Sequence, residues 1–423
     1  MSKVVVVGGG WAGCAAAVMA AKKGCEVTIL EKTDMLLGTG LVGGIMRNNG
    51  RFTATEEAIV LGIGDLFLLI DATCRHTNIE FPGHKHASLY DVGLMEPEIK
   101  KALLKMGVRI CLQERITELE MQNGRIMKVF GADKKAYPGD VFIDTTGTAG
   151  GIPNCTKHGN GCAMCILRCQ SFGGRVSLTA KAGVEEIVGV RKDGSIGAMS
   201  GSCKLFKESL APDVVRMLND TGVVVIPVPK EQVNADKLSS KACQQYASQE
   251  YAENIILLDT GHAKLMSPFY PLELLRLIPG MEGARYEDPY SGGIGNSMRY
   301  FGMAPRDDAL KVDGVENLFC AGEKAGLLVG HTEAIITGSL AGLNAARLAQ
   351  DLDPVIFPET LALGNAVKFV REEMKTEEGK CMKYTFSGSV LYERMLELSL
   401  YTTDLEEIRS RVEKTGLKEV IAR

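Results

Sequence analysis

The stretch KVVVVGGGWAGCAAAVMAAKKGCEVTILE, residues 3–31, decides the fold. Its apolar run at 3–7 predicts a buried parallel strand, and a glycine-rich turn, an alanine-rich helix at 14–22 and a second strand at 26–30 follow it. This order is typical of the βαβ unit that binds a dinucleotide at the amino terminus of its helix. The sequence therefore predicts an α/β fold built on a Rossmann-type parallel sheet.

The glycines of this turn and the acidic residue after the second strand have separate tasks. Gly8 permits the tight turn, Gly10 lets a pyrophosphate approach the backbone, and Gly13 lets the helix pack closely on the strand. Glu31 is placed to accept hydrogen bonds from ribose hydroxyls, which favours FAD or NAD over NADP. The cofactor contacts predicted in this region are Gly8, Gly10, Trp11, Ala12, Gly13, Glu31 and Lys32.

A second glycine-rich region lies near the other end of the chain. Residues 317–323, NLFCAGE, predict a short strand that ends in a glycine turn, and residues 330–338, GHTEAIITG, lead into a helix over 339–349. This order resembles the late strand–glycine–helix element of the glutathione-reductase-like flavoproteins, whose final helix directs its amino terminus at the flavin. A helix amino terminus stabilises negative charge on a reduced flavin. The resemblance implies FAD rather than NAD.

Further segments resemble parts of the same superfamily that lie near the cofactor. Residues 140–146, DVFIDTT, with Gly147 are similar to a strand that ends beside the cofactor. Residues 94–106 predict a helix, and residues 109–115 predict a strand that passes the adenine. The further contacts that this resemblance implies are Arg115, Ile116, Thr146, Gly147, Gly322, Glu323, His331, Thr332 and Ala334.

Two more stretches sharpen the resemblance. Residues 277–284, LIPGMEGA, and residues 338–347, GSLAGLNAAR, are similar to stretches of two flavoprotein families that modify tRNA uridine. These families are glucose-inhibited division protein A and the folate-dependent tRNA uracil methyltransferases. The similarity covers residues 1–150 and 275–350, and it implies the FAD cofactor more firmly than any substrate.

Four cysteines form a cluster between these regions. Cys155, Cys162, Cys165 and Cys169 have the spacing C-x6-C-x2-C-x3-C on a glycine-containing stretch, which favours a [4Fe–4S] cluster. Three other interpretations stay open: a zinc site, a redox dithiol of Cys162 and Cys165, and a nucleophilic or inert cysteine. His331 either relays protons at the flavin or caps its helix. The catalytic candidates are Cys162, Cys165 and His331.

The motifs divide the chain into an interrupted FAD-binding domain, an insertion and a tail. The FAD-binding domain takes residues 1–150 and 285–350, and an inserted α+β domain at 151–284 carries the cysteines and covers the flavin. Residues 351–423 are expected to form a helical C-terminal region, for which a role in a homo-oligomer is open. The elements predicted outside the FAD-binding domain are a strand at 223–228 and helices at 211–219, 239–254, 359–375 and 389–421.

The bulk composition limits the class of protein. With 423 residues the chain is too long for one compact core, and its net charge of −4 argues against a generally basic nucleic-acid binder. No apolar run reaches the length of a membrane span, and the first strand follows Met1 too closely for a signal peptide. We therefore expect a cytoplasmic protein without membrane insertion, whose cysteines are mostly free thiols, metal ligands or redox groups.

These features favour an FAD-dependent oxidoreductase that passes electrons between the flavin and a small-molecule or electron-carrier substrate, in part through an iron–sulfur cluster. Two alternatives stay open. The first is a flavoprotein that modifies uridine in tRNA or rRNA, which the resemblance of residues 275–350 suggests. The second is a flavoprotein subunit of an electron-transfer complex, which would have no turnover alone.

Overall fold

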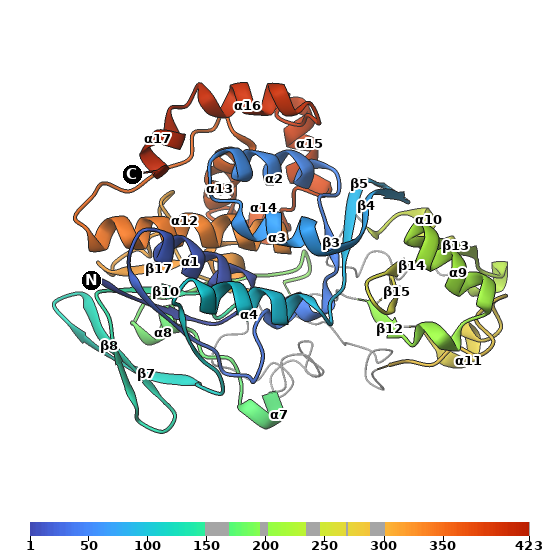
Figure 1. Cartoon of the computed structure of the whole chain (residues 1–423), viewed down its shortest axis with the longest axis horizontal. Helices are drawn as coiled ribbons and strands as arrows, with labels where there is room; N and C mark the ends of the chain where they lie inside the picture. The colour runs from blue at the N-terminus through green and yellow to red at the C-terminus, as the bar shows by residue number, and fades with distance from the viewer. Residues whose placement is uncertain (149–168, 195–201, 234–245, 268–269, 288–300, 423) are drawn as a thin grey trace.

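Figure 1 shows the computed structural model of the chain. The structure describes residues 1–148, 169–194, 202–233, 246–267, 270–287 and 301–422. A main body surrounds a parallel sheet, part of the insertion forms a smaller lobe, and the C-terminal helices pack on the main body. Within these residues, no helix has the length and apolar character that a membrane span requires.

The main body is organised around a five-stranded sheet. Its strands stand in the order β17-β10-β1-β2-β6, and every neighbouring pair is parallel. The strands are β1 (Lys3–Val7), β2 (Glu26–Leu30), β6 (Arg109–Cys111), β10 (Val141–Asp144) and β17 (Leu318–Cys320). The four valines of the central strand are all buried, as expected where a parallel sheet is covered on both faces. The predicted α/β fold class is confirmed.

Helices α1 (Trp11–Lys22) and α12 (His331–Ala349) lie against each other beside this sheet. A Cβ atom added to Gly338 or Gly342 of α12 would lie 2.2 Å from a backbone carbonyl oxygen of α1. The two helices are therefore in backbone contact. Helix α12 begins at His331 rather than at the predicted residue 339, because its first turns are buried and contain isoleucine and threonine, which indicate a helix poorly.

Two small antiparallel sheets that the sequence did not reveal flank the parallel sheet. The first has the order β7-β8-β9, and the second has the order β3-β5-β4 and faces the lobe of the insertion. Their strands are β7 (Ile116–Gln122), β8 (Arg125–Gly131), β9 (Ala136–Pro138), β3 (Ile45–Met46), β4 (Cys74–Phe81) and β5 (His84–Tyr90). The helices between them are α2 (Gly50–Val60), α3 (Asp65–Thr73) and α4 (Met95–Lys105).

Helix α4 matches the helix predicted at 94–106. The strand predicted at 109–115 is shorter, because β6 ends at Cys111 and the chain then turns toward β7.

The insertion forms a lobe with its own antiparallel sheet, drawn at the right of Figure 1. The strand order is β12-β15-β14-β13, and the hydrophobic cluster beneath it is separate from that of the main body. The strands are β12 (Cys203–Leu205), β13 (Val223–Pro227), β14 (Asn254–Asp259) and β15 (Ala263–Leu265). The helices are α9 (Pro212–Thr221), α10 (Gln249–Glu253) and α11 (Leu272–Leu275).

The strand predicted at 223–228 and the helix predicted at 211–219 are confirmed. Of the helix predicted at 239–254, the described residues contain only α10 as a helix, followed by β14 from residue 254.

Not all of the predicted insertion belongs to this lobe. Strand β11 (Ile187–Gly189) pairs with β16 (Phe301–Met303), and α8 (Leu178–Lys181) packs against β7 of the main body. Residues around α8 and β11 therefore share the main hydrophobic core, although they fall within the predicted insertion.

The C-terminal region is helical, as predicted. Its helices are α13 (Ala362–Glu373), α14 (Glu377–Lys380), α15 (Ser389–Glu397), α16 (Leu405–Glu413) and α17 (Leu417–Ala422). The single helical stretch predicted at 389–421 is three helices, because Ser399 and Gly416 adopt positive φ and end two of them. Helices α13 and α16 pack on α2, and the C-terminal region contributes to the main core.

Candidate active site

The glycine turn between β1 and α1 packs tightly against other backbone atoms at Gly8 and Gly13, but it has open space at Gly10. A Cβ on Gly13 would lie 1.9 Å from the Gly8 carbonyl oxygen, and a Cβ on Gly8, which has φ +107°, would lie 2.5 Å from the Thr145 carbonyl oxygen. By contrast, a Cβ on Gly10 would meet no protein atom within 4 Å. The turn is thus a cradle whose free space lies at Gly10, beside the amino terminus of α1. This is where a pyrophosphate would approach the backbone.

Glu31 closes the cradle from the end of β2. One of its carboxylate oxygens accepts a hydrogen bond from the Gly9 N–H at 2.7 Å, and the other accepts from the backbone and hydroxyl of Thr33 at 2.8 and 3.0 Å. The carboxylate is buried and holds the turn in place. Because a carboxylate has about four acceptor sites, it can still accept a ribose hydroxyl.

Lys32 and Arg115, two predicted cofactor contacts, both bind one loop of the protein. The Lys32 ammonium donates to the carbonyl oxygen of Gly173 at 3.0 Å, and the Arg115 guanidinium donates to that of Gly174 at 2.8 Å. Ile116 begins β7 and is buried. Lys32 and Arg115 therefore both contact the loop that follows α7 (Cys169–Phe172). Their contact with a cofactor stays a prediction.

The end of β10 is fixed by a buried carboxylate. Asp144 accepts hydrogen bonds from the backbone and hydroxyl of Thr146, at 3.1 and 2.7 Å, and from both groups of Thr179, each at 2.7 Å. Gly147 has φ +76°, and a Cβ there would lie 2.8 Å from the Arg175 guanidinium. Thr146 and Gly147 thus lie in a hydrogen-bonded turn after Thr145, whose carbonyl oxygen faces Gly8 of the cradle, and their contact with a cofactor stays a prediction.

The amino terminus of α12 is the second helix end at the site. Gly330, with φ +146°, precedes His331, and the Ala334 N–H donates to the Gly330 carbonyl oxygen at 3.0 Å to close the first turn. Thr332 is fully buried in the same turn, and His331 and Ala334 are partly exposed. The positive end of the α12 dipole therefore lies beside His331.

Gly322 and Glu323 join α12 to the cradle. The Gly322 N–H donates to the Thr337 hydroxyl at 2.9 Å, and a Cβ on Gly322 would lie 3.0 Å from the Cβ of Ala12. Glu323 accepts a hydrogen bond from Thr148 at 2.9 Å. The two glycine regions that the sequence placed far apart therefore meet at one site.

Three aromatic rings, those of Trp11, Tyr90 and His331, pack together between the two helix ends. The Trp11 ring packs edge-on against Tyr90 at 6.0 Å and lies 6.4 Å from the His331 ring. The Tyr90 hydroxyl donates to the Gly40 carbonyl oxygen at 3.0 Å and lies 3.4 Å from Nδ1 of His331. Burial raises the pKa of Tyr90 to about 12, so the phenol is neutral at pH 7.

The indole N–H of Trp11 is buried and has no hydrogen-bond partner of normal geometry among the described residues. Its polar neighbour is Tyr90, whose pKa the indole N–H lowers, against the larger effect of burial.

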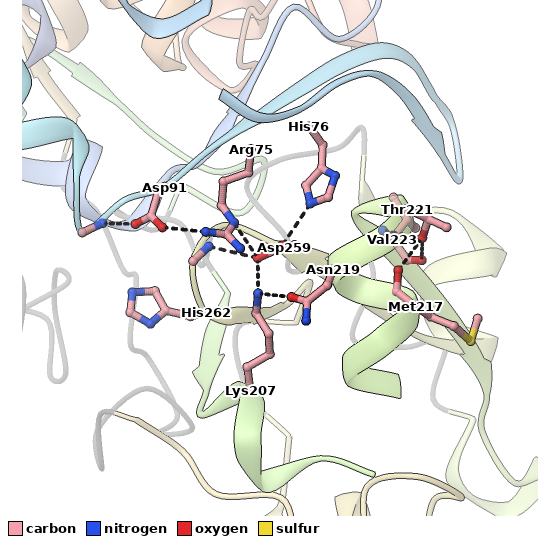
Figure 2. A network of polar contacts seen from close by, with 12 residues as sticks. Arg75, His76, Asp91, Lys207, Met217, Asn219, Thr221, Val223, Asp259 and His262 are labelled. Atoms are coloured by element: carbon pink, nitrogen blue, oxygen red, sulfur yellow. Dashed lines mark hydrogen bonds and ion pairs between the residues drawn. The ribbon is translucent and has the colours of Figure 1, made fainter. Parts of the chain in front are cut away.

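A polar network joins the insertion to the β4–β5 hairpin (Figure 2). The buried carboxylate of Asp259 accepts from Lys207 at 2.6 Å, from His76 at 2.9 Å and from Arg75 at 3.1 Å. Arg75 also binds Asp91, at 3.1 Å. Burial alone would raise the pKa of Asp259, but the hydrogen bonds from Lys207 and His76 and the nearby charges lower it below its ordinary value.

Two lysines of the insertion bind the loop that faces Trp11. Lys204 donates to the carbonyl oxygen of Leu41 at 3.1 Å, and the buried Lys264 donates to that of Val42 at 2.6 Å. Both carbonyls belong to the short 3-10 turn at Gly38–Val42. The insertion therefore contacts the wall of the site directly.

Sequence reasoning missed Tyr90 and Asp259. Asp259 ends the apolar run NIILLD, and an acidic residue directly after a buried strand is a signal that could have singled it out. Tyr90 ends the strand HKHASLY, where no motif marks it. Its role depends on a tertiary contact with His331.

The predicted cysteine cluster is not placed by the structure. Cys155, Cys162 and Cys165 lie outside the described residues, and only the backbone of Cys169, at the start of α7, is described. Among the residues that are described, no three His, Cys, Asp or Glu side chains converge to hold a metal ion. The iron–sulfur, zinc, dithiol and nucleophile interpretations therefore stay predictions.

Comparison with known proteins identifies the family. The model of the family described as glucose inhibited division protein A matches residues 3–270 and 261–353, which is most of the chain. Among curated proteins, the methylenetetrahydrofolate–tRNA-(uracil-5-)-methyltransferase TrmFO of Lysinibacillus sphaericus is 34% identical over 103 residues, and that of Thermus thermophilus is 39% identical over 100 residues. These alignments span 24% and 23% of this chain and 22% and 21% of the relatives, so they cover about a fifth of each relative's length.

Solved structures support the same fold. GidA of Aquifex aeolicus in one crystal form covers 100% of this chain, with a TM-score of 0.66 at 15% identity, and 73% of that protein is matched. A second crystal form covers 98% of this chain, with a TM-score of 0.60 at 16% identity and 78% of that protein matched. The chain has the Rossmann-type FAD-binding fold, and it belongs to the glucose inhibited division protein A family.

Proposed function

We propose that this protein is an FAD-dependent enzyme that modifies uridine in tRNA. The observation that carries the proposal is the cradle itself, which is closed by backbone contacts at Gly8 and Gly13 and open at Gly10, in a chain of the glucose inhibited division protein A family. The names of the TrmFO relatives supply the substrate class. Their short alignments make that class a proposal rather than a finding.

The residues at the site fit FAD. The opening at Gly10 and the amino terminus of α1 would receive the pyrophosphate, and Glu31 would accept a ribose hydroxyl. The amino terminus of α12 would lie at the flavin ring, beside the packed rings of Trp11, Tyr90 and His331. When bound, FAD supplies two-electron transfer, which a uridine methylation with a folate one-carbon donor requires.

The protein's own groups would manage protons and orientation. His331 lies at the helix end with its Nδ1 beside the Tyr90 hydroxyl, and its imidazole would relay a proton there. Tyr90 stays neutral and is anchored to the Gly40 carbonyl oxygen. Removal of the imidazole should therefore slow a step that moves a proton, while FAD binding should depend on the glycine cradle.

The first experiment measures cofactor and RNA binding by the full chain. We expect bound FAD in the visible spectrum and binding of bulk tRNA in a filter assay, with an affinity that falls as salt rises because phosphate contacts release counterions. Gly10→Ala is the control that should lose FAD. The absence of any salt-sensitive tRNA binding would contradict the tRNA substrate.

The second experiment measures the product. The chain is incubated with an unmodified tRNA transcript, a reductant and methylenetetrahydrofolate, and the nucleosides are analysed by mass spectrometry. We expect 5-methyluridine, and a loss of product when methylenetetrahydrofolate is omitted. FAD-replete protein that binds tRNA but changes no uridine under any of these conditions would leave the family assignment intact and remove the folate-dependent reaction.

We propose an electron-transferring oxidoreductase as the second candidate, on the strength of the cysteine spacing at Cys155, Cys162, Cys165 and Cys169. A [4Fe–4S] cluster there would exchange electrons with the flavin, either in an enzyme or in a subunit of an electron-transfer complex. Anaerobic purification with assays of iron and sulfide tests it, and about four iron atoms per chain are expected for a cubane. A flavin spectrum without iron, unchanged in Cys162→Ser, would remove the cluster.

A further inference from the structure

The turn between β14 and β15 of the insertion is docked on the wall of the candidate active site. The Val92 N–H donates to the Thr260 carbonyl oxygen at 3.1 Å. A Cβ on Gly44 would lie 2.4 Å from the Thr260 side chain, and a Cβ on Gly261 would lie 2.6 Å from the Asp91 carboxylate. The turn and the wall are therefore in close contact, and a movement of one must move the other.

Asp259, at the start of this turn, ties the contact to the β4–β5 hairpin. Its carboxylate is fully buried and accepts from Lys207 of the insertion and from Arg75 and His76 of β4 (Figure 2). The Gly261 N–H adds a further hydrogen bond at 3.2 Å. A buried carboxylate with this many donors has one well-defined position, because the loss of any donor would leave a charge under-compensated.

Arg75 carries the contact onward to the strand that bears Tyr90. Its guanidinium binds Asp259 through Nε and Asp91 through Nη1, both at 3.1 Å. Asp91 directly follows Tyr90, and Tyr90 pairs across the hairpin with Cys74, the neighbour of Arg75. The arginine thus bridges a carboxylate of the insertion and a carboxylate adjacent to Tyr90.

The path ends at the histidine of α12. The Tyr90 hydroxyl lies 3.4 Å from Nδ1 of His331. The backbone N–H of Tyr90 donates to the Gly44 carbonyl oxygen at 3.0 Å. A Cβ on Gly43 would lie 1.9 Å from the His331 ring. The histidine ring is therefore confined by Tyr90 and by the same loop that the insertion contacts at Gly44.

We propose that Asp259 and Arg75 are positioning residues through which the insertion fixes the Tyr90–His331 pair at the flavin. This inference rests on the proposed FAD function, and it adds to that function the residues that couple the insertion to the cofactor. Neither residue touches the site. They act on His331 through Asp91 and Tyr90, and the two lysines at the Leu41 and Val42 carbonyls hold the insertion in place independently.

The test measures the midpoint potential of FAD in the full chain by dye-coupled titration with dithionite. Asp259→Asn should shift the potential to a more negative value, because a displaced His331 stabilises the reduced flavin less. Tyr90→Phe should shift it in the same direction. The matched control is Asp213→Asn, an exposed carboxylate on α9 of the same lobe, which should leave the potential unchanged.

The decisive comparison uses a His331→Ala background. There Asp259→Asn should cause no further shift, because the group through which it acts is gone. An equal shift in both backgrounds would overturn the coupling. The rate of flavin reduction should follow the same pattern, with a change of about three- to tenfold in the native background only.

A second variant keeps the test valid if Asp259→Asn fails to fold. Arg75 is about one-third exposed, so Arg75→Gln should fold and should reproduce the negative shift. Arg75→Lys, which keeps the charge but spans only one carboxylate, should give a smaller shift. FAD-replete Arg75→Gln with the potential of the native chain would refute the inference. A native chain that binds no FAD would instead refute the proposed function.

Discussion

Gly10 and Gly13 belong to one turn and have opposite surroundings. Gly13 has no space for a side chain, because its Cβ would collide with the Gly8 carbonyl oxygen. Gly10 has φ −68°, which any residue adopts, and the space beside it is open. We therefore expect Gly10 to be needed for ligand binding, whereas Gly13 is needed for the packing of the helix on the strand.

This difference gives a paired prediction. Gly13→Ala should lower the free energy of unfolding by about 2 kcal/mol or more, because the helix must move away from the strand. Gly10→Ala should change it by less than about 0.5 kcal/mol and yet weaken FAD binding at least tenfold, since its methyl group occupies the cradle. Urea unfolding of the apoprotein and an FAD titration measure the two effects. Equal destabilisation by both substitutions would contradict the assigned roles.

At this scale the sequence predicted the residues of the motif well and the residues of the tertiary contacts poorly. Gly8, Gly13 and Glu31 stand where the βαβ pattern predicts them, because their tasks are local. Tyr90 and Asp259 act through partners far away in the chain, and no spacing in the sequence reveals those partners.

Among the elements, α13 depends on a residue of another helix for its amino-terminal cap. Glu57 of α2 accepts hydrogen bonds from the first N–H groups of α13, those of Ala362 and Leu363, at 3.0 and 3.1 Å. Helix α13 has no side-chain cap of its own. Burial raises the pKa of Glu57 to about 7, and these hydrogen bonds and Arg411 only partly oppose it.

A pH dependence of stability follows from the burial of the Glu57 carboxyl group. Because the pKa of Glu57 in the folded chain lies above its value of 4.5 in the unfolded chain, the folded state binds the proton more tightly. Protonation of Glu57 therefore adds on the order of 3 kcal/mol to the free energy of unfolding below about pH 4.5, and this stabilisation is lost as the pH rises through 7. Urea unfolding of the native chain and of Glu57→Gln across pH 5–8 should show this difference in slope. Parallel pH profiles of the two proteins would contradict it.

Elements were predicted where the hydrophobic period was clear. The strands β1, β2 and β17 and the helix α9 have strong patterns, whereas the first turns of α12 bury polar and apolar residues alike and show no helical period. The β3-β5-β4 sheet was missed for a different reason. Strand β4 is irregularly paired with β5 and mostly exposed, so it lacks the alternation that indicates a strand.

For the whole molecule, the lobe of the insertion has a hydrophobic cluster apart from that of the main body. The C-terminal region, by contrast, contributes side chains such as Phe386 and Met395 to the main core. The predicted body, insertion and tail are consecutive segments of the chain, but they do not correspond to three separate hydrophobic cores, because the tail shares the core of the body. Composition cannot reveal which of two segments shares a core with the body.

The cluster around Leu218 is separate from the main core, although a third cluster joins β5 of the main body to β14 of the lobe through Leu89 and Leu258. We therefore expect the lobe to unfold in a transition of its own that overlaps with that of the main body. Leu218→Ala, within the cluster of the insertion, should destabilise the lobe by about 2–5 kcal/mol and leave the loss of bound FAD at its original urea concentration. Val6→Ala, in the central strand, should shift the loss of FAD instead. Circular dichroism and flavin fluorescence in urea measure the two transitions. A single transition that both substitutions shift equally would contradict independent cores.

The shared core predicts the effect of shortening the chain. A chain that ends at residue 350 should be insoluble or unfolded, because the apolar surfaces of α2 and α12 lose their cover. The control ends at residue 416 and lacks only α17, in which Ile421 is the buried residue. It should fold and bind FAD. Expression, gel filtration and FAD content compare the two, and a folded, FAD-binding chain of residues 1–350 would show that the tail is dispensable.

The strand order β17-β10-β1-β2-β6 also bears on how the protein is made. The ribosome must synthesise residues 1–317 before the last strand of the sheet exists, and it must reach residue 349 before α12 is complete. Until then β10 is an open edge and the alanine-rich surface of α1 is bare, which favours association between nascent chains. If α12 helps to hold FAD as proposed, chains whose translation stalls before this point should fail to retain the cofactor, and riboflavin supply should rescue only molecules whose synthesis has passed α12.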